Sequence, residues 1–384
     1  MSDQAWERTA RPSMLKRGKM LAAAMALALT LGAGAGAIVG DGLLPAAVSA
    51  QTVAASQANA ASVAAAANPA VVTITTLLEV SDDTSRGDSQ PVLPGAQEIP
   101  GQGGRLTPLG TGSGFIIDQA GYVVTNNHVV EIGSAFEVTY FDGTTVSAAL
   151  VGSDPFQDIA VLKIELAAGE AVPGTVAFGD SDLMEAGDPV VAIGTPYGEY
   201  ANTVTSAIVN AVERGLDSGG GYDLPNLIQH DADIYPGSSG GPLFNANAEV
   251  IGINVAKAFT GRMGMDLEGF NFAIDSNAAR QIVDEIIAGG SFERSYLGIR
   301  GQVTWDGVQV VSLETGGPAA VADLQENDII VGIAGVDGED PNEALDVILF
   351  EMRPGDAVTL EVLRGGQLIA VDVTLGERPQ TIIS

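Results

Sequence analysis

The feature that most constrains the fold is a succession of short β-rich segments between Gly114 and Ile274. Each segment is rich in Val, Ile, Thr, Tyr or Phe and is bounded by turn residues, which is the pattern of a strand. Asp142-Gly143 joins two of these segments and is a strong hairpin signal. Many short strands at this spacing predict a sandwich or barrels. The segments that we expect to be strands are residues 122–125, 136–141, 144–151, 159–164, 190–193, 203–212 and 250–255.

A change of period marks the end of this first unit. Apolar residues fall on one helical face over residues 276–288, and Gly289-Gly290 ends the pattern. Residues 79–110 indicate a long loop because they are rich in Asp, Ser, Pro and Gly. We therefore expect the first folded domain to span residues 68–290, after a linker over residues 51–67.

Residues 294–378 predict a second, smaller domain that mixes strands and helices. Pro318 can begin a first helix, and Asp340-Pro341 begins a second, with Asp340 as the N-cap. The expected strands of this domain are residues 308–311, 329–333, 358–363 and 368–373.

The cysteine, histidine and charge content excludes several kinds of site. The chain has no cysteine, so it can form neither a disulfide framework nor a thiolate metal site. Its two histidines, His128 and His230, are too few for a His-rich metal centre, and we expect no metal or other cofactor. The formal net charge of −31 repels nucleic acid, so no nucleic-acid partner is expected.

Residues 1–50 resemble an export segment. Basic residues at positions 16, 17 and 19 precede an uncharged stretch over residues 20–40, and such a basic end stays in the cytoplasm. The segment is either a cleaved signal peptide, with Val48-Ser49-Ala50 as the cleavage site, or a single membrane anchor, since about 20 residues span a bilayer. We favour the anchor because the candidate cleavage site lies far from the apolar stretch.

The stretch most informative about chemistry is Gly237-Ser238-Ser239-Gly240-Gly241-Pro242-Leu243. A serine between glycines can expose its hydroxyl while neighbouring backbone N–H groups turn toward one point, as acyl transfer requires. The Gly-x-Ser-x-Gly spacing also matches the nucleophile elbow of α/β-hydrolases, in which the catalytic histidine follows the serine. No histidine follows residue 230 in this chain, and the flanking segments are β-rich, so the elbow interpretation fails.

The two histidines are then the candidate general bases. His230 lies nine residues before Ser239 on the strand that leads to it, and we interpret His230 as structural. His128, at the end of an expected strand, remains as the base. An orienting acid is expected between base and nucleophile. Asp158 opens an apolar strand and needs a partner there, whereas the alternative, Asp154, precedes a proline and indicates a turn.

Three segments together resemble the HtrA/Deg family of trypsin-like serine proteases. They are residues 124–130, 158–164 and 236–243, and shorter matches lie at residues 112–115, 194–198 and 272–274. They occur in the order of the family, and the resemblance covers roughly residues 60–378. It implies a mainly β fold, with a chymotrypsin-like double β-barrel protease domain followed by a small α+β PDZ domain.

The resemblance implies a catalytic role for each matching residue. Ser239 would be the nucleophile, His128 the general base and then the acid, and Asp158 the orienting carboxylate. The oxyanion hole would consist of Gly237, Ser238 and Ser239, with the N–H groups of the first and last as donors.

The resemblance also implies contacts with substrate. Asn254, Val255 and Ala256 would pair with the extended substrate backbone. Ser238 stands where the family usually has asparagine. Asp233 lies at the expected floor of the specificity pocket, where the family usually has a small or apolar residue. An acid there could favour cleavage after Lys or Arg; the alternative is that Asp233 faces solvent in a shifted loop.

In the second domain, Tyr296-Leu297-Gly298-Ile299 resembles the carboxylate-binding loop of a PDZ domain. Its N–H groups would bind a peptide's C-terminal carboxylate while the peptide adds a strand to the sheet edge. The hydrophobic pocket would use Ile299 and the helix at residues 341–352. Leu297 and Ile299 can also be ordinary core residues.

The resemblance implies an ATP-independent serine endopeptidase that degrades unfolded or damaged cell-envelope proteins and binds C-terminal peptides. We expect it outside the cytoplasm, tethered to the membrane by its N-terminal segment, and assembled as a homo-oligomer, the family being commonly trimeric. Loops at residues 212–226, 233–238 and 257–269 would regulate it by ordering the oxyanion hole. The alternative function is a chaperone or a PDZ peptide-binding scaffold with weak proteolysis.

Overall fold

The computed structural model describes residues 60–81, 97–98, 104–217, 223–255, 271–335, 348 and 352–378. All of them belong to the compact unit Ser49–Ser384. The expected export segment at residues 1–50 and nearly all of the expected helix at residues 341–352 lie outside these ranges. Over the described ranges, no helix is both long and apolar enough to cross a membrane.

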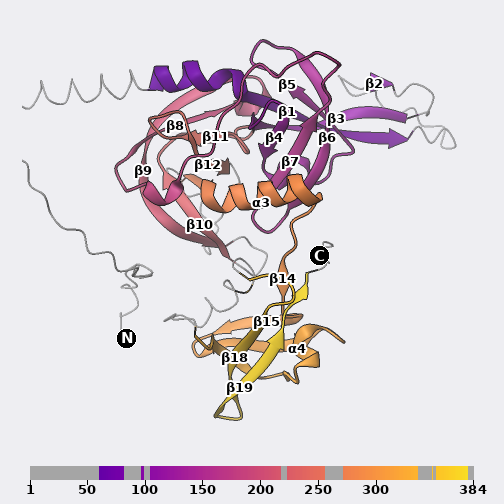
Figure 1. Cartoon of the computed structure of the whole chain (residues 1–384), viewed down its shortest axis with the longest axis vertical. Helices are drawn as coiled ribbons and strands as arrows, with labels where there is room; N and C mark the ends of the chain where they lie inside the picture. The colour runs from indigo at the N-terminus through magenta and orange to yellow at the C-terminus, as the bar shows by residue number, and fades with distance from the viewer. Residues whose placement is uncertain are drawn as a thin grey trace, which may run out of the picture. The chain divides into compact units, whose positions relative to one another are not determined.

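Six strands close into a first barrel (Figure 1). Fully buried side chains from facing strands, such as Val72, Ile74, Val123 and Leu162, fill its interior. A short strand, β2 (Gln97–Glu98), pairs with the start of β3. The barrel order is β1 (Val71–Ser81), β5 (Ala135–Thr139), β6 (Thr145–Asp154), β7 (Ile159–Ile164), β4 (Tyr122–Thr125) and β3 (Gly104–Ile116), which pairs back onto β1.

A second closed barrel follows in the chain. Its core contains Val190, Ile228, Leu243 and Ile251. The barrel order is β10 (Asp223–His230), β13 (Asn271–Asp275), β12 (Val250–Val255), β11 (Pro242–Phe244), β8 (Pro189–Gly194) and β9 (Thr203–Asp217). The sequence left a sandwich and barrels open, and the structure has two barrels.

Helix α3 (Ser276–Gly289) packs against strands of both barrels, namely β6 and β7 of the first and β12 and β13 of the second. Asp275 caps its start by accepting from the Ala278 N–H group, and Gly290 ends it at φ +80°. Residues 60–67 are also helical. Short helical turns occupy connections: η1 (Asn68–Ala70), α2 (Asn127–Val130), η2 (Ser181–Leu183) and η3 (Pro196–Gly198).

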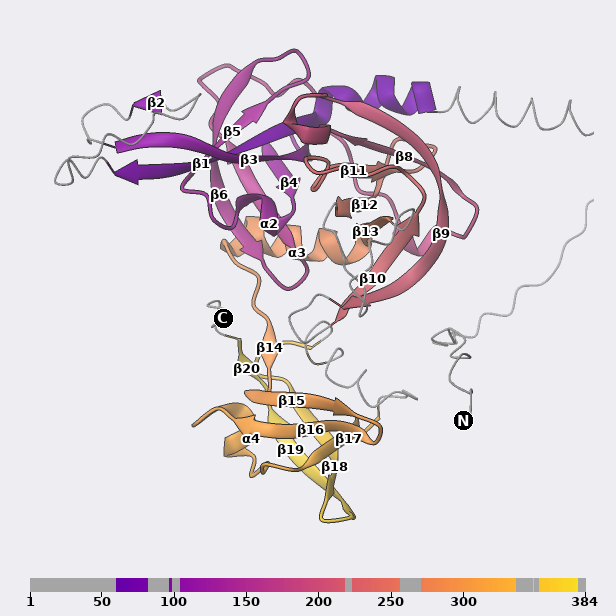
Figure 2. The same ribbon diagram turned by 180° about the vertical axis from the view of Figure 1, so that it is seen from behind.

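The C-terminal region has its own sheet and core (Figure 2). β14 (Ser295–Tyr296) pairs with β20 (Gly376–Glu377), and α4 (Pro318–Val321) begins at the expected proline. The antiparallel sheet has the order β15 (Ile299–Thr304), β16 (Gly307–Leu313), β17 (Ile329–Ile333), β18 (Ala357–Arg364) and β19 (Gln367–Thr374).

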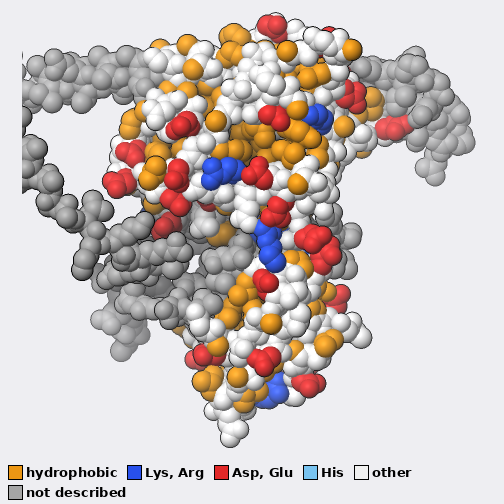
Figure 3. All heavy atoms as spheres, in the orientation of Figure 1, with side chains coloured by type: hydrophobic (Ala, Val, Ile, Leu, Met, Phe, Trp, Pro, Cys, Tyr) orange, Lys and Arg blue, Asp and Glu red, His pale blue; other side chains and the backbone are white. Residues whose placement is uncertain are grey.

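Several strands extend beyond their apolar segments. The sequence predicts a loop over residues 79–110, but β1 and β3 pair as far as Ser81 and Gly104. Likewise, β9 and β10 pair as far as Asp217 and Asp223, inside the loop expected at residues 212–226. Backbone hydrogen bonds make these pairings, so they leave no alternating apolar pattern in the sequence. Acidic side chains are spread over the face shown in Figure 3, in keeping with the net charge.

Candidate active site

His128 and Asp158 lie side by side because their strands are neighbours. β4 ends at Thr125, and its antiparallel partner β7 begins near Ala160, so the residues that follow β4 meet the residue that precedes β7. Nδ1 of His128 lies 2.7 Å from Oδ2 of Asp158. The backbone N–H of His128 also donates to Oδ1 of Asp158, at 2.9 Å.

The backbone of Asp158 is fixed as firmly as its carboxylate. Its carbonyl oxygen accepts from the Asn127 N–H at 3.1 Å and from Nδ2 of Asn126 at 2.9 Å. Asp158 adopts a φ of +55°, a left-handed conformation that is uncommon for a residue other than glycine. These bonds offset the strain, and they set the direction in which the carboxylate faces the imidazole.

Ser239 lies in the turn between β10 and β11, on the second barrel. The first barrel contacts this turn directly, because the Ser113 N–H of β3 donates to the Ser239 carbonyl at 2.8 Å. Gly240 has a φ of +82°, and a Cβ built on it would lie 2.2 Å from Oγ1 of Thr125 and 3.0 Å from the Asn126 nitrogen. The turn around Ser239 therefore packs against the residues that lead into His128.

Backbone hydrogen bonds fix two peptide groups around Ser239. The Pro236 carbonyl accepts from the Tyr197 N–H at 2.6 Å, and the Ser238 carbonyl accepts from the Gly241 N–H at 3.0 Å. In a trans peptide the C=O and N–H groups point in opposite directions. The N–H groups of Gly237 and Ser239 are therefore directed away from these two bonds.

Ser113 is a site residue that sequence reasoning did not single out. Its fully buried Oγ accepts from the Thr195 N–H at 2.8 Å and donates to the Gly237 carbonyl at 2.7 Å. Oγ1 of Thr195 in turn lies 2.7 Å from Oγ1 of Thr73. In the sequence, residues 112–115 and 194–198 are only short matches to the family. The structure shows that they join the two barrels next to the Ser239 turn.

The residues predicted to contact substrate are Asn254, Val255, Ala256 and Asp233, and the structure does not favour a substrate contact for all of them. The backbone N–H and C=O of Asn254 bond to Gly241 and Gly240, so they are not available to pair with a substrate. Val255 ends β12, and Ala256 lies outside the described residues. Asp233 is exposed, which favours the interpretation of a solvent-facing acid.

Asp154, the alternative orienting acid, pairs with Arg294. Nε of Arg294 lies 3.2 Å from each carboxylate oxygen, and its Nη2 also donates to Asp154. Both side chains are almost fully buried. The Asp154 carboxylate also accepts from the N–H groups of Phe156 and Gln157. Asp154 therefore shapes the turn that carries Asp158.

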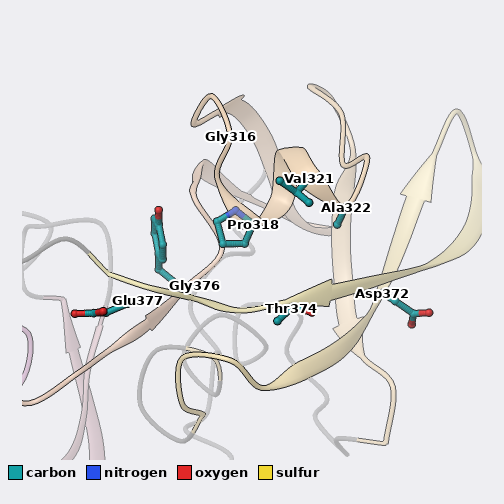
Figure 4. Close-up of a pocket in the computed structure, with 9 residues that line it drawn as sticks. Gly316, Pro318, Val321, Ala322, Asp372, Thr374, Gly376 and Glu377 are labelled. Atoms are coloured by element: carbon teal, nitrogen blue, oxygen red, sulfur yellow. The ribbon is translucent and has the colours of Figure 1, made fainter.

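The predicted carboxylate-binding loop is divided between core and surface. Leu297 is buried, and its carbonyl accepts from the Ala319 N–H at 2.8 Å. Gly298 has a φ of +73°, and Ile299 begins β15, which is an edge strand of the sheet. Tyr296 is the member of this loop that lines a hollow of about 450 Å³. The other residues lining the hollow, labelled in Figure 4, are Gly316, Pro318, Val321, Ala322, Asp372, Thr374, Gly376 and Glu377.

No cluster of three or more His, Asp or Glu residues that could hold a metal ion occurs in the part of the chain that the structure describes. The structure instead brings the imidazole of His128 and the carboxylate of Asp158 together beside the turn that contains Ser239. This set suits acyl transfer.

Family comparisons match the same two regions. The family described as "Trypsin-like peptidase domain" matches residues 112–253, and the family described as "PDZ domain" matches residues 295–375. The chain is 40% identical over 310 residues to a probable periplasmic serine endoprotease DegP-like of Brucella suis biovar 1 (strain 1330), which covers 77% of this chain and 56% of the relative. The chain thus spans about half the length of this relative.

Other relatives are covered more completely. The serine protease Do-like HtrA of Bacillus subtilis (strain 168) is 34% identical over 338 residues, with 82% of this chain and 72% of the relative covered. The solved structure of the HtrA-type protease AlgW with decapeptide is 32% identical, with a TM-score of 0.65 over 84% of this chain and 99% of that chain. The chain therefore belongs to the HtrA/Deg family of trypsin-like serine proteases with a PDZ domain.

Proposed function

We propose that this chain is an ATP-independent serine endopeptidase in which Ser239 is the nucleophile, His128 the general base and Asp158 the orienting acid. The observation that carries the proposal is the 2.7 Å contact between His128 and Asp158, beside the turn that contains Ser239. The protease domain would span residues 68–290 and the PDZ domain residues 294–378.

The proposed mechanism follows from the donor and acceptor roles of these groups. Because an ionised carboxylate only accepts, Nδ1 of His128 carries a proton and Nε2 is the basic nitrogen. Nε2 takes the hydroxyl proton of Ser239 as Oγ attacks the scissile carbonyl carbon, and His128 then gives that proton to the leaving amine. Water, activated by the same nitrogen, hydrolyses the acyl-enzyme and restores Ser239.

The oxyanion hole is the second part of the proposed mechanism. The N–H groups of Gly237 and Ser239 would donate to the oxygen on which charge develops, with Ser238 between them. The bonds from Tyr197 to the Pro236 carbonyl and from Gly241 to the Ser238 carbonyl support this assignment, since they turn both N–H groups to the opposite side. In this proposal the loops around residues 233–238 regulate activity by keeping or losing these bonds.

We further propose that the substrates are unfolded or damaged proteins of the cell envelope, and that the PDZ region binds their C-terminal peptides. The edge position of β15 supports strand addition by a peptide. The probable periplasmic endoproteases among the relatives support a location outside the cytoplasm. In this proposal, residues 1–50 are the export segment and remain as a single membrane anchor. We also propose that the chain assembles into a homo-oligomer, namely a trimer.

Labelling by a phosphonylating serine-hydrolase reagent tests the catalytic assignment. Ser239→Ala should abolish both labelling and peptide cleavage while leaving the fold intact, and Ser147→Ala, an exposed serine of β6, is the control. A C-terminal peptide should increase labelling of the unmodified protein if PDZ occupancy orders the loops. Turnover that survives Ser239→Ala would overturn the proposal.

A further inference from the structure

His230 is a fully buried histidine that the proposed mechanism does not use. It is the last residue of β10, and it is paired with Asn271 of β13 on one side and Val209 of β9 on the other. It lies nine residues before Ser239 in the sequence. Burying a polar side chain costs free energy unless its polar atoms are hydrogen-bonded, so the partners of both ring nitrogens matter.

The hydrogen bonds of His230 identify which nitrogen carries the proton. The Ala232 N–H donates to Nδ1 at 3.2 Å, so Nδ1 is an acceptor and Nε2 is the protonated nitrogen. Nε2 is buried without a partner among the described residues, and the same holds for Oδ1 of Asn254. One atom is a donor and the other an acceptor, and the Asn254 side chain and the Phe272 backbone are the two hydrogen-bonding groups that act on the imidazole.

Asn254 connects this histidine to the nucleophile turn. Its Nδ2 donates to the Gly241 carbonyl at 3.0 Å, its N–H donates to the same oxygen at 2.8 Å, and its carbonyl accepts from the Gly240 N–H at 2.9 Å. Gly240 and Gly241 are the two residues that follow Ser239. The orientation of the Asn254 amide therefore determines whether Nδ2 or Oδ1 faces the Gly241 carbonyl.

We infer that His230 is a positioning residue for the nucleophile, because its Nε2–H selects the orientation of the Asn254 amide. With Oδ1 facing the imidazole N–H, Nδ2 faces the Gly241 carbonyl and fixes the backbone beside Ser239. Without that donor, a flipped amide would place Oδ1 against the Gly241 carbonyl, and two acceptors repel. The inference rests on the proposed role of Ser239 as nucleophile.

The surroundings of His230 keep it neutral. Burial lowers the pKa of His230 to about 4, and the charge of Asp231, the Asn254 amide and the Phe272 backbone raise it only in part. Asp231 is the charged group that acts on the imidazole. The register partners of His230 on β9 and β13, Val209 and Asn271, are uncharged, and so is Asn254 of β12. Protonation would also place an N–H at Nδ1 against the Ala232 N–H, so acid removes the acceptor on that side of the ring while Nε2 keeps its N–H.

Two substitutions of His230 separate positioning from packing. His230→Leu removes the donor at similar volume and should lower kcat about tenfold with KM nearly unchanged, the size expected from one lost buried hydrogen bond. His230→Gln keeps an N–H at the position of Nε2 and should recover most of kcat. The rate of phosphonylation should follow kcat. An unchanged kcat in a folded His230→Leu protein would overturn the inference, as would an equal loss in both variants.

A second measurement does not depend on activity. Because the chain has two histidines, selective ¹⁵N-histidine labelling of a Ser239→Ala, His128→Gln protein leaves one imidazole to observe. Its shifts should show the Nε2–H tautomer and stay constant from neutral pH to about pH 5. An Nδ1–H tautomer or titration above pH 6 would refute the positioning role and leave the assignment of Ser239 untouched. Failure of Ser239→Ala to abolish cleavage would refute the proposed function and leave this tautomer unchanged.

Discussion

Replacing Ser113 by alanine tests how the two barrels hold the nucleophile turn. The change removes one oxygen atom and creates almost no cavity, so its effect comes from two hydrogen bonds. The Thr195 N–H is buried and would lose its acceptor, which costs about 1–3 kcal/mol. The Gly237 carbonyl is half-buried and can bind water instead, so its loss adds about 1 kcal/mol. We expect the free energy of unfolding to fall by about 3 kcal/mol.

The effect of Ser113→Ala on kcat tests the reasoning more directly than its effect on stability. Without Ser113 Oγ, the Gly237–Ser238 peptide, which lies between the two proposed oxyanion donors, can rotate, and the N–H groups of Gly237 and Ser239 on either side of it lose their alignment for part of the time. We expect kcat to fall by about 10- to 100-fold, less than removing an oxyanion donor outright, with KM nearly unchanged. Urea unfolding in the Ser239→Ala background measures stability without self-digestion, and peptide turnover with Ser239 intact measures kcat.

Ser147→Ala is the matched control for Ser113→Ala, because Ser147 lies on a strand of the same barrel with its side chain exposed. It should change the free energy of unfolding by less than about 0.5 kcal/mol and leave kcat unchanged. If Ser113→Ala behaves like Ser147→Ala in both assays, the two bonds of Ser113 do not support the turn, and the reasoning fails.

Three further predictions follow from the same contacts. Asp158→Asn should lower kcat by about 10³- to 10⁴-fold in a peptide-cleavage assay, because an amide no longer selects the Nδ1–H tautomer of His128; a loss below tenfold would contradict the assigned role. Gly240→Ala should abolish activity and lower the melting temperature strongly, since its Cβ would lie 2.2 Å from Oγ1 of Thr125, whereas Gly143→Ala, at φ +87° in open space, should cost about 1 kcal/mol. For His230, the pKa of the folded state is lowered from 6.5 to about 4, so the unfolded chain binds more protons in that window. Stability should therefore be lost as pH falls from about 6.5 to 4, by about 3 kcal/mol more in the unmodified protein than in His230→Gln, as measured by urea unfolding at each pH; parallel pH profiles would contradict a neutral buried His230.

Much of the architecture is predictable because apolar residues mark it. The strand at residues 159–164, the Asp142-Gly143 turn and the helix that begins at Ser276 all match the structure closely. The neighbourhood of His128 and Asp158 follows from the ends of two strands, which the sequence also indicates. Side-chain identity is informative in these places because burial or catalysis requires particular residue types.

The remaining features depend on backbone partners far apart in the chain. Ser113 binds a carbonyl 124 residues away, and Asp154 binds a guanidinium 140 residues away. Any serine or aspartate could make such bonds, so residue type alone does not reveal them. The same reason explains Asn254, which the resemblance assigns to substrate pairing and whose backbone instead bonds to Gly240 and Gly241.

We expect the bonds from Ser113 also to determine when activity appears during synthesis. A chain made from its N-terminus completes the barrel of His128 and Asp158 before residues 237–241 exist, and the turn takes its shape only against β3 of that barrel. We therefore expect a growing chain not to cleave other incompletely folded chains until its second barrel closes. Separately produced halves, residues 60–174 and 175–290, should each fail to react with a phosphonylating reagent, and reaction of either half alone would contradict this order. Mixing the two should restore the reaction, so that activity itself reports that folding is complete.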